Sequence, residues 1–314
     1  MPRAGEKWDI VGFGVAAVDD VFYMNTFPAP GEKTLFDRYM RVGGGQTATA
    51  FVAASRLGSR CFYAGHFGEN DLSRMVQGIF DREGIGRREA IEHPAALPTH
   101  TLVLVQTTSG ERSNVANLSG VRPADIGDWE TNLIAGAGCL FVDQSIPECQ
   151  VAAAKVARRH GVPVVADLEN IATEATRELY RLIDHIILPL HVAVRELGAL
   201  GPEDAVRTML RDAPRVVACV TDGDRGAWYA SAGSPAEILR QPAVAMPRIV
   251  DTNGCGDVFH GAYADALVRG IPLSERMRRA ATAAAIKTQK PGGQTGAPTA
   301  EELETFLGGC AEGV

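Results

Sequence analysis

The sequence predicts an α/β fold in which a mostly parallel central sheet lies between two layers of helices. Short apolar runs alternate along the chain with longer segments of helical periodicity. Runs such as 164–166 and 216–220 are apolar at every position, as in strands that are buried on both faces. The 314 residues, 46% of them hydrophobic, are enough for one large domain of this class.

The positions of the elements follow from the period of the apolar residues. Short apolar runs predict strands at Ile10–Phe13, Cys61–Gly65, Thr101–Gln106, Cys139–Asp143, Val162–Asp167, His185–Leu188, Val216–Thr221 and Gly226–Ala230. Longer runs with helical periodicity predict helices at Thr47–Leu57, Leu72–Glu83, Glu148–His160, Pro202–Arg211, Gly256–Arg269, Ser274–Lys287 and Ala300–Phe306.

Two segments, roughly 15–41 and 99–117, do not follow this alternation. Both alternate polar and apolar residues and mostly lack helix signals, so each is a candidate source of strands for a small separate sheet. No internal repeat, low-complexity tract or linker divides the chain. We therefore predict a single domain over 1–314 with these two segments inserted in it.

Charge and motif content exclude several classes of protein. The net charge of −7, with both signs interspersed, argues against a nucleic-acid partner. No apolar run approaches the ~20 residues of a membrane span, and the first residues lack a signal-peptide pattern, so a cytoplasmic protein is expected. The six cysteines, at 61, 139, 149, 219, 255 and 310, form no CxxC pair and indicate reduced thiols. Neither a P-loop nor an HExxH motif is present.

Residues 251–263 read Asp-Thr-Asn-Gly-Cys-Gly-Asp-Val-Phe-His-Gly-Ala-Tyr and carry the strongest chemical signal. A glycine-rich turn that opens a helix points several N–H groups at one place, where the positive end of the helix dipole also favours an anion. Asp257 at the helix start is a candidate proton acceptor for phosphoryl transfer to a hydroxyl. We expect the helix start to favour its charged form. The competing interpretation is a structural helix cap.

Three more glycine-rich segments accompany this turn. Gly12-Phe-Gly14-Val-Ala-Ala17 mimics a dinucleotide fingerprint, but the residues that follow are typical of an extended strand rather than a helix. Residues 42–50 read Val-Gly-Gly-Gly-Gln-Thr-Ala-Thr-Ala and precede a predicted helix. Residues 221–226 read Thr-Asp-Gly-Asp-Arg-Gly and form a predicted turn between two strands.

Together these segments resemble the PfkB (ribokinase-like) carbohydrate kinases. The turn resembles the family signature Asp-Thr-x-Gly-Ala-Gly-Asp, with Cys255 in place of the usual Ala. Gly44 and Gly45 match the glycine pair of the amino-terminal signature, which ends at Arg56-Leu57-Gly58. Residues 221–226 and 287–298 match the family's nucleotide-side loops in the same order along the chain.

The resemblance implies an ATP-dependent sugar kinase with a small β-sheet lid, a homodimer formed through that lid, and Mg²⁺. For catalysis the resemblance implies Asp257 as the base and Gly254, Cys255 and Gly256 as the anion hole. The residues that it implies for binding the sugar are Asp19, Gly44, Gly45, Thr49, Lys33 and Asp257. The residues that it implies for binding ATP are Thr221, Gly223, Gly226, Lys287 and Gly293, and Asp251 is implied to bind a monovalent cation such as K⁺. Asp20, beside Asp19, leaves the choice of sugar ligand between the two open.

The chain departs from the family pattern at two places. Thr49 stands where the family has a sugar-binding Asn, and the Asn-x-x-Glu motif expected after 185–188 is absent, so Mg²⁺ is expected to be held by ATP and water. Thr49, Lys33 and the 287–293 loop resemble the branch that contains sulfofructose kinase. Lys33, Arg38, Arg41 and Arg112 are candidates to meet an anionic sugar, although solvated surface charges are the ordinary interpretation.

The acceptor therefore stays open among ribose, fructose, a related ketose and an anionic sugar. A nucleoside kinase of the same superfamily is a second hypothesis, with Phe13, Phe22, Tyr23 and Phe36 as candidates to stack on a base. A non-catalytic sugar-sensing protein is a third hypothesis. Asp257 argues against the sensor, while the missing Asn-x-x-Glu motif favours it.

Overall fold

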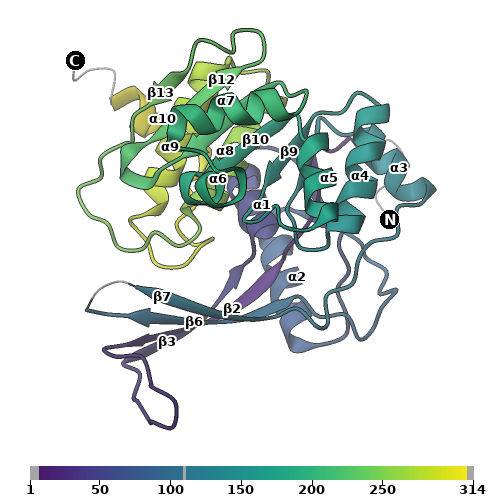
Figure 1. Ribbon diagram of the computed structural model, residues 1–314. Coiled ribbons are helices and arrows are strands. Elements are labelled where there is room, and N and C mark those ends of the chain that lie inside the picture. The colour runs from purple at the N-terminus through teal and green to yellow at the C-terminus, as the bar shows by residue number, and fades with distance from the viewer. Residues whose placement is uncertain (1–6, 109–110, 310–314) are drawn as a thin grey trace.

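The computed structural model describes residues 7–108 and 111–309 and confirms the predicted α/β sandwich (Figure 1). A nine-stranded sheet runs in the order β13-β12-β11-β10-β9-β8-β1-β4-β5. All neighbouring pairs from β11 to β5 are parallel, whereas β12 and β13 are antiparallel to their neighbours. The strands are β1 Ile10–Phe13, β4 Cys61–Tyr63, β5 Gly86–Arg87, β8 Cys139–Val142, β9 Val164–Asp167, β10 His185–Pro189, β11 Val217–Thr221, β12 Ala227–Ser231 and β13 Leu239–Gln241.

Helices cover both faces of this sheet. One core contains apolar residues of α1 Gln46–Arg56, α2 Asp71–Glu83, α8 Cys255–Val268, α9 Leu273–Lys287 and α10 Ala300–Gly309. The other contains residues of α3 Asp128–Ala135, α4 Pro147–Arg159, α5 Glu174–Leu182, α6 Leu190–Leu197 and α7 Pro202–Asp212. Successive strand residues such as Val164 and Val165 enter opposite cores, which explains why the strands are apolar throughout.

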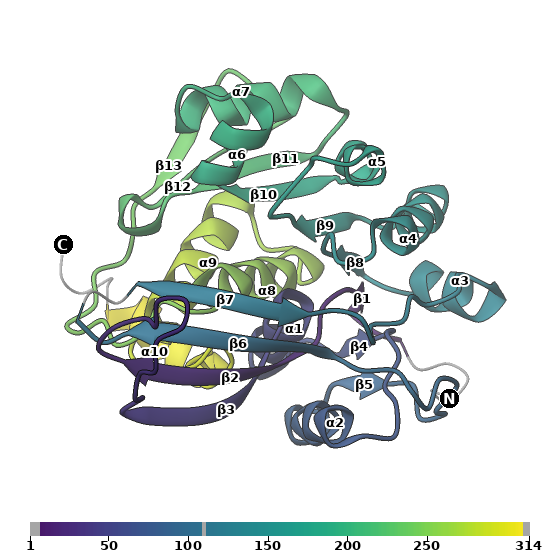
Figure 2. The same ribbon diagram turned by 60° about the horizontal axis from the view of Figure 1, so that its bottom comes forward.

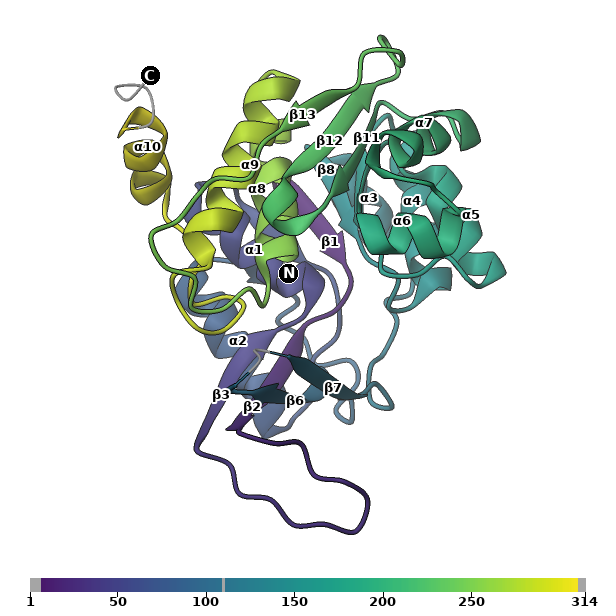
Figure 3. The same cartoon turned by 60° about the vertical axis from the view of Figure 1, so that its left-hand side comes forward.

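A separate four-stranded sheet projects from the main body beneath the edge of the large sheet (Figures 1 and 2). Its order is β3-β2-β6-β7, with β2 at Ala17–Met24, β3 at Arg38–Gly44, β6 at Thr99–Gln106 and β7 at Arg112–Asn117. The loop between β2 and β3 extends away from the end of this sheet (Figure 3). The sequence that mimics a dinucleotide fingerprint thus continues into a strand, β2, and not into a helix.

Three helices, α3, α5 and α6, have no counterpart among the predicted elements. They have 8, 9 and 8 residues, so each offers too few turns for a clear helical period in the sequence. Cys61, Cys139, Cys149, Cys219 and Cys255 are free thiols, while Cys310 lies outside the described residues. Within residues 7–108 and 111–309, no helix has the length and apolar character to span a membrane.

Candidate active site

Polar residues gather where the parallel strands end, because carboxyl ends of parallel strands meet at one edge of a sheet. Asp143 follows β8 and is fully buried. Its carboxylate accepts hydrogen bonds from the Val15 N–H at 2.5 Å, the Thr47 hydroxyl at 2.8 Å and the Ser145 N–H at 2.8 Å. Asp143 therefore ties the exit of β1 to the start of α1 and fixes the root of the small sheet.

The predicted anion-binding turn forms the amino terminus of α8. Gly254 is the N-cap residue, with φ 77°, a left-handed conformation that favours glycine. The Cys255 N–H donates a long hydrogen bond of 3.3 Å to the Thr252 carbonyl. Burial raises the pKa of the Cys255 thiol to about 11, so the thiol is protonated and a poor nucleophile at neutral pH. Gly256 is exposed at the first turn of the helix.

Asp257 in the first turn of α8 forms a hydrogen-bonded carboxyl pair with Asp167, the last residue of β9. Burial raises the pKa of Asp167 to about 8, and the charges of Glu169 and Asp143 act in the same direction. Burial and the neighbouring Asp167 also raise the pKa of Asp257 well above its ordinary value. The expectation that the helix start favours a charged Asp257 is therefore wrong, because burial and a second carboxyl outweigh the dipole.

His260, one turn further along α8, is buried, and its Nδ1 lies 3.5 Å from Oδ2 of Asp167. Its Nδ1 lies 2.8 Å from the Gly256 carbonyl oxygen and its Nε2 lies 3.2 Å from the Ile187 carbonyl oxygen. Burial lowers the pKa of His260. The ring thus ties α8 to β10 and places the Asp257 turn against the sheet.

Asp251 connects the turn to the loop that follows α9. Its carboxylate accepts hydrogen bonds from the Asn253 N–H and from the Gly292 N–H, both at 2.8 Å. Its main-chain oxygen accepts a hydrogen bond of 2.8 Å from Nζ of Lys287, whose side chain is fully buried. The resemblance implies that Lys287 lies beside ATP, but burial keeps its side chain inside the protein.

Asp19 and Asp20 point to opposite faces of the small sheet, since successive residues of a strand alternate. Asp20 accepts hydrogen bonds from Tyr39 at 2.6 Å and from two nitrogens of Arg41 at 2.7 Å, which hold its pKa well below the ordinary value. Burial raises the pKa of Asp19 to about 6. Of the two candidate sugar ligands, Asp19 is therefore the one whose carboxylate is not engaged in the ion pair with Arg41.

Gly44 lies against Asp19, and Thr49 lies near Gly293, the residue against which Gly254 of the α8 turn packs. A Cβ atom on Gly44 would lie 2.1 Å from Oδ2 of Asp19, so only glycine allows this approach. The hydroxyl of Thr49 is buried and has no hydrogen-bond partner among the described residues. A Cβ atom placed on Gly293 would lie 3.7 Å from this hydroxyl. The Thr49 hydroxyl therefore lies without a polar partner in the described part of the chain, at the boundary between α1 and the loop that contains Gly293.

Of the four cationic candidates for an anionic sugar, the structure places Arg112 against the turn of α8. Its guanidinium lies 3.3 Å from the Thr252 hydroxyl and 3.5 Å from Oδ1 of Asp251. Arg41 is bound to Asp20 on the other face, and the Arg38 guanidinium lies 3.8 Å from the centre of the Tyr23 ring. The fourth, Lys33, is exposed in the loop between β2 and β3.

The aromatic candidates for stacking on a base are mostly engaged elsewhere. Phe13 is buried in the core beneath α3–α7. Phe22 contacts Phe36 with ring centres 5.3 Å apart, and it lies on the same face of the small sheet as Asp20. Tyr23 shares the face of Asp19, but Arg38 covers its ring. This arrangement gives the nucleoside hypothesis little support.

Three of the five residues implied to bind ATP lie at the end of β11 and in the turn before β12. Thr221 ends β11, Gly223 begins a short 3₁₀ turn, and Gly226 follows that turn. The Asp222 N–H donates to the Gly226 carbonyl at 2.8 Å and closes the turn. Gly223 is exposed, so backbone at the carboxyl end of β11 is open to a ligand.

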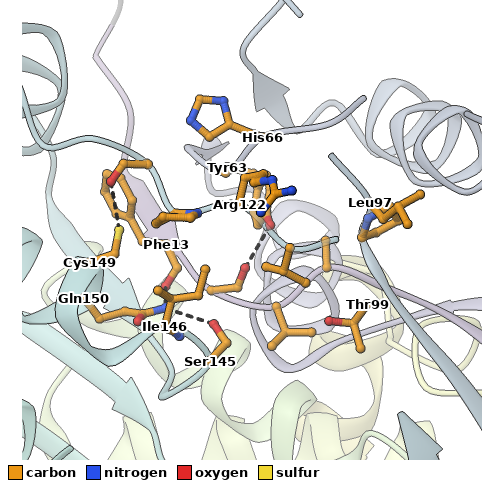
Figure 4. Close-up of a pocket in the computed structure, with 18 residues that line it drawn as sticks. Phe13, Tyr63, His66, Leu97, Thr99, Arg122, Ser145, Ile146, Cys149 and Gln150 are labelled. Atoms are coloured by element: carbon orange, nitrogen blue, oxygen red, sulfur yellow. Dashed lines mark hydrogen bonds between the residues drawn. The ribbon is translucent and has the colours of Figure 1, made fainter. Parts of the chain in front are cut away.

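A cavity lies at the root of the small sheet, beside the carboxyl ends of β1 and β4 (Figure 4). Its polar lining includes His66, Arg122, Ser145 and Gln150, and its apolar lining includes Leu97. Gln150 lies 3.0 Å from the Ser145 hydroxyl and braces this wall. The cavity is also lined by Ala16, which precedes Asp19 by three residues in the chain.

Sequence reasoning missed Asp167, which is paired with Asp257, and Glu169, whose charge also raises the pKa of Asp257. The available signal is their place at or just beyond the carboxyl end of an apolar strand, where parallel α/β sheets collect functional residues. Their pairing with α8 depends on the strand order, which single-strand patterns do not contain. Among the residues that the structure describes, no group of three or more His, Cys, Asp or Glu side chains is arranged to hold a metal ion.

Comparison with known proteins decides the family to which this site belongs. Residues 10–300 match the profile described as pfkB family carbohydrate kinase. The chain belongs to the pfkB family of carbohydrate kinases. Its activity is therefore that of a phosphotransferase with an alcohol group as acceptor.

Individual pfkB-family relatives match over nearly their whole length. Ribokinase from Bacillus subtilis is 28% identical over 305 residues, which cover 95% of this chain and 99% of that protein. A candidate ribokinase from Agrobacterium tumefaciens has a crystal structure with a TM-score of 0.87 and 26% identity, covering 98% of this chain and 99% of that one. Ribokinase from Arabidopsis thaliana, solved with ribose and ATP, shares the fold with a TM-score of 0.82 and 22% identity, covering 96% and 99%.

Proposed function

We propose that this pfkB-family chain transfers the γ-phosphate of ATP to a hydroxyl of a ribose-like or related keto sugar, with Asp257 as the proton acceptor. The observation that carries this proposal is the place of Asp257: its carboxyl is paired with Asp167 beside the glycine turn that opens α8. Such a turn favours the charge of a phosphoryl group, while the carboxylate orients the nucleophile. Nearly full-length similarity to a ribokinase supports ribose as the first acceptor to test.

The proposed step moves one phosphoryl group and one proton. The sugar hydroxyl oxygen forms a bond to the γ-phosphorus as the bond from that phosphorus to the bridging oxygen breaks, and ADP leaves. The hydroxyl proton passes to Asp257. Because its pKa is raised, Asp257 is a better proton acceptor than an ordinary aspartate once it is ionised. The N–H groups of Gly254 and Gly256 would stabilise charge on the transferred group.

The sugar and ATP would bind on opposite sides of this turn. Asp19, Gly44, Gly45 and Thr49 form the proposed sugar side, since a carboxylate and a hydroxyl suit sugar hydroxyls. The exposed backbone at 223–225 would contact ATP, as would the loop that contains Gly293, against which Gly254 packs. Mg²⁺ is expected to enter with ATP and keep several waters, because the Asn-x-x-Glu motif is missing from the sequence.

The direct test is an assay of ADP release with ATP and one acceptor at a time. The panel contains ribose, fructose, other ketoses, sugar acids, sulfonated sugars and nucleosides. We expect turnover with a sugar and a much lower kcat/KM with nucleosides. Binding of a sugar measured by calorimetry, without turnover of any acceptor, would contradict the kinase proposal and favour a sensor.

Replacing Thr49 by Val tests the sugar side. The change removes a buried hydroxyl that has no protein partner, so the melting temperature is expected to stay equal or rise. The loss of one hydrogen bond to the sugar is expected to raise its KM about tenfold. Thr47→Val is the matched control, because its hydroxyl bonds Asp143 at 2.8 Å, and this variant is expected to melt at a lower temperature. An unchanged sugar KM in Thr49→Val would show that Thr49 does not bind the sugar.

The pair of Asp257 and Asp167 predicts a particular pH dependence. Asp257 accepts a proton only when ionised, so activity falls as the pH drops through its pKa, and the raised pKa places this fall at a higher pH than for an ordinary aspartate. Asp167→Asn removes the neighbouring charge, so we expect the acidic limb of kcat/KM to move about one pH unit lower. Glu169→Gln, a weaker contributor, is expected to give a smaller shift. An acidic limb that does not move in Asp167→Asn excludes the coupling.

The outer face of the small sheet supports a homodimer, in which two such sheets would pack together. Leu102 and Val115 pair directly across β6 and β7 and are 41% and 60% exposed. At the opposite edge of the sheet, Tyr39 in β3 and Phe36 just before β3 are 44% and 54% exposed. An exposed apolar face of this kind is typical of an interaction surface. Sedimentation equilibrium would give twice the monomer mass, and a single-chain mass would exclude this dimer.

A further inference from the structure

Lys287, the last residue of α9, places a buried ammonium group beside the anion-binding turn. The side chain is 0% exposed, and its Nζ donates to the main-chain oxygen of Asp251 at 2.8 Å. Lysine is almost never fully buried without a partner, because desolvation of the charge is costly. A buried lysine at this place therefore needs a physical explanation.

The ammonium lies where two segments of the site are bound together. The N–H groups of Val250 and Asp251 donate to the Thr288 carbonyl at 2.8 and 3.1 Å. The Gly292 N–H donates to the Asp251 carboxylate at 2.8 Å. The segment that carries Gly254 and Asp257 is thus held against the loop after α9. Lys287 supplies a buried positive charge at this junction.

The same junction is where the sequence resemblance implies a monovalent cation at Asp251. Such an ion needs carbonyl oxygens, but the Asp251 carbonyl already accepts the ammonium of Lys287. A second cation nearby would also meet the repulsion of Lys287 and of Arg112, whose guanidinium lies 3.5 Å from Oδ1 of Asp251. The residues present do not fit a K⁺ ion at this place.

We propose that the ammonium of Lys287 is a built-in substitute for the monovalent cation and makes the enzyme independent of K⁺. Lys287 acts as a positioning residue, because it holds the Asp251–Gly254 turn against the loop after α9 and does not touch the transferred phosphoryl group. Burial lowers the pKa of Lys287, and the charge of the neighbouring Asp251 acts in the opposite direction and favours the ammonium. The catalytic part of this inference rests on the proposed kinase function.

The first test uses the wild-type protein in KCl and in tetramethylammonium chloride of equal ionic strength. We expect kcat and KM for ATP to agree within about twofold, and the melting temperature to show no saturable response to K⁺. A several-fold activation by K⁺, or a saturable rise in melting temperature, would overturn the inference. The melting measurement needs no sugar, so it decides about the cation even if no acceptor is found and the kinase proposal fails.

The second test replaces the ammonium. Lys287→Ala is expected to lower kcat about 100-fold in tetramethylammonium chloride, because displacement of the turn by a fraction of an ångström is costly. Saturable recovery of kcat by K⁺ or NH₄⁺, with a K⁺-dependent melting temperature, would support the substitution. Lys290→Ala is the matched control, since its Nζ lies 3.5 Å from Glu302 in a half-exposed pair on the same loop. Full activity of Lys287→Ala in tetramethylammonium chloride would overturn the inference.

Discussion

Asp257→Asn is expected to lower kcat about a thousandfold while leaving the affinity for ATP close to that of the wild type. The amide keeps the size and a hydrogen-bonding oxygen, but it cannot accept the hydroxyl proton. The substitution also removes one of two closely paired carboxyls, so the melting temperature is not expected to fall. Single-turnover phosphoryl transfer and calorimetric titration with a non-hydrolysable ATP analogue measure the two quantities separately.

The control for this variant is Asp265→Asn in the same helix. Asp265 is buried and accepts a hydrogen bond of 2.8 Å from Ser59, away from the proposed site. Its amide can still accept that bond, so near-normal kcat is expected, with any change confined to the melting temperature. Wild-type turnover in Asp257→Asn would exclude Asp257 as the proton acceptor. Loss of ATP binding would indicate a structural role instead.

Gly254→Ala is expected to lower kcat about 100-fold or more by moving the anion-binding turn. Residue 254 has φ 77°, where a side chain costs about 1–2 kcal/mol. An added Cβ would also lie 2.7 Å from the Cα of Gly293, so the turn and the loop after α9 would have to separate. The measurements are kcat, ATP affinity and the melting temperature of the variant.

Gly270→Ala separates the steric effect from the backbone strain. Gly270 follows the other end of α8 with φ 70°, and no atom lies within 4 Å of an added Cβ. Both variants therefore carry left-handed strain, but only Gly254→Ala forces two loops apart. We expect Gly270→Ala to melt at a lower temperature and to retain kcat. Equal kcat in the two variants would show that the position of the turn does not control phosphoryl transfer.

Most of the architecture could be predicted from the sequence. Buried parallel strands are apolar at every position, and the order of strands and helices then favours the layered fold. Helices α3, α5 and α6 were harder to predict because 8 or 9 residues carry little periodicity. The alternation in 15–41 and 99–117 indicates strands of a second sheet, but not which of Asp19 and Asp20 faces the site.

The residues 251–257, with the resemblance that they and the other glycine-rich segments carry, indicated the reaction type proposed here. A glycine turn, a helix start and an aspartate within one contiguous segment encode their own geometry. Tertiary structure decided the rest. It brought Asp167 from β9 to Asp257 and thereby reversed the expected direction of the pKa of Asp257. It also buried Lys287 against Asp251. Local sequence encodes backbone conformation, whereas desolvation and charge pairing depend on which distant segments the sheet order brings together.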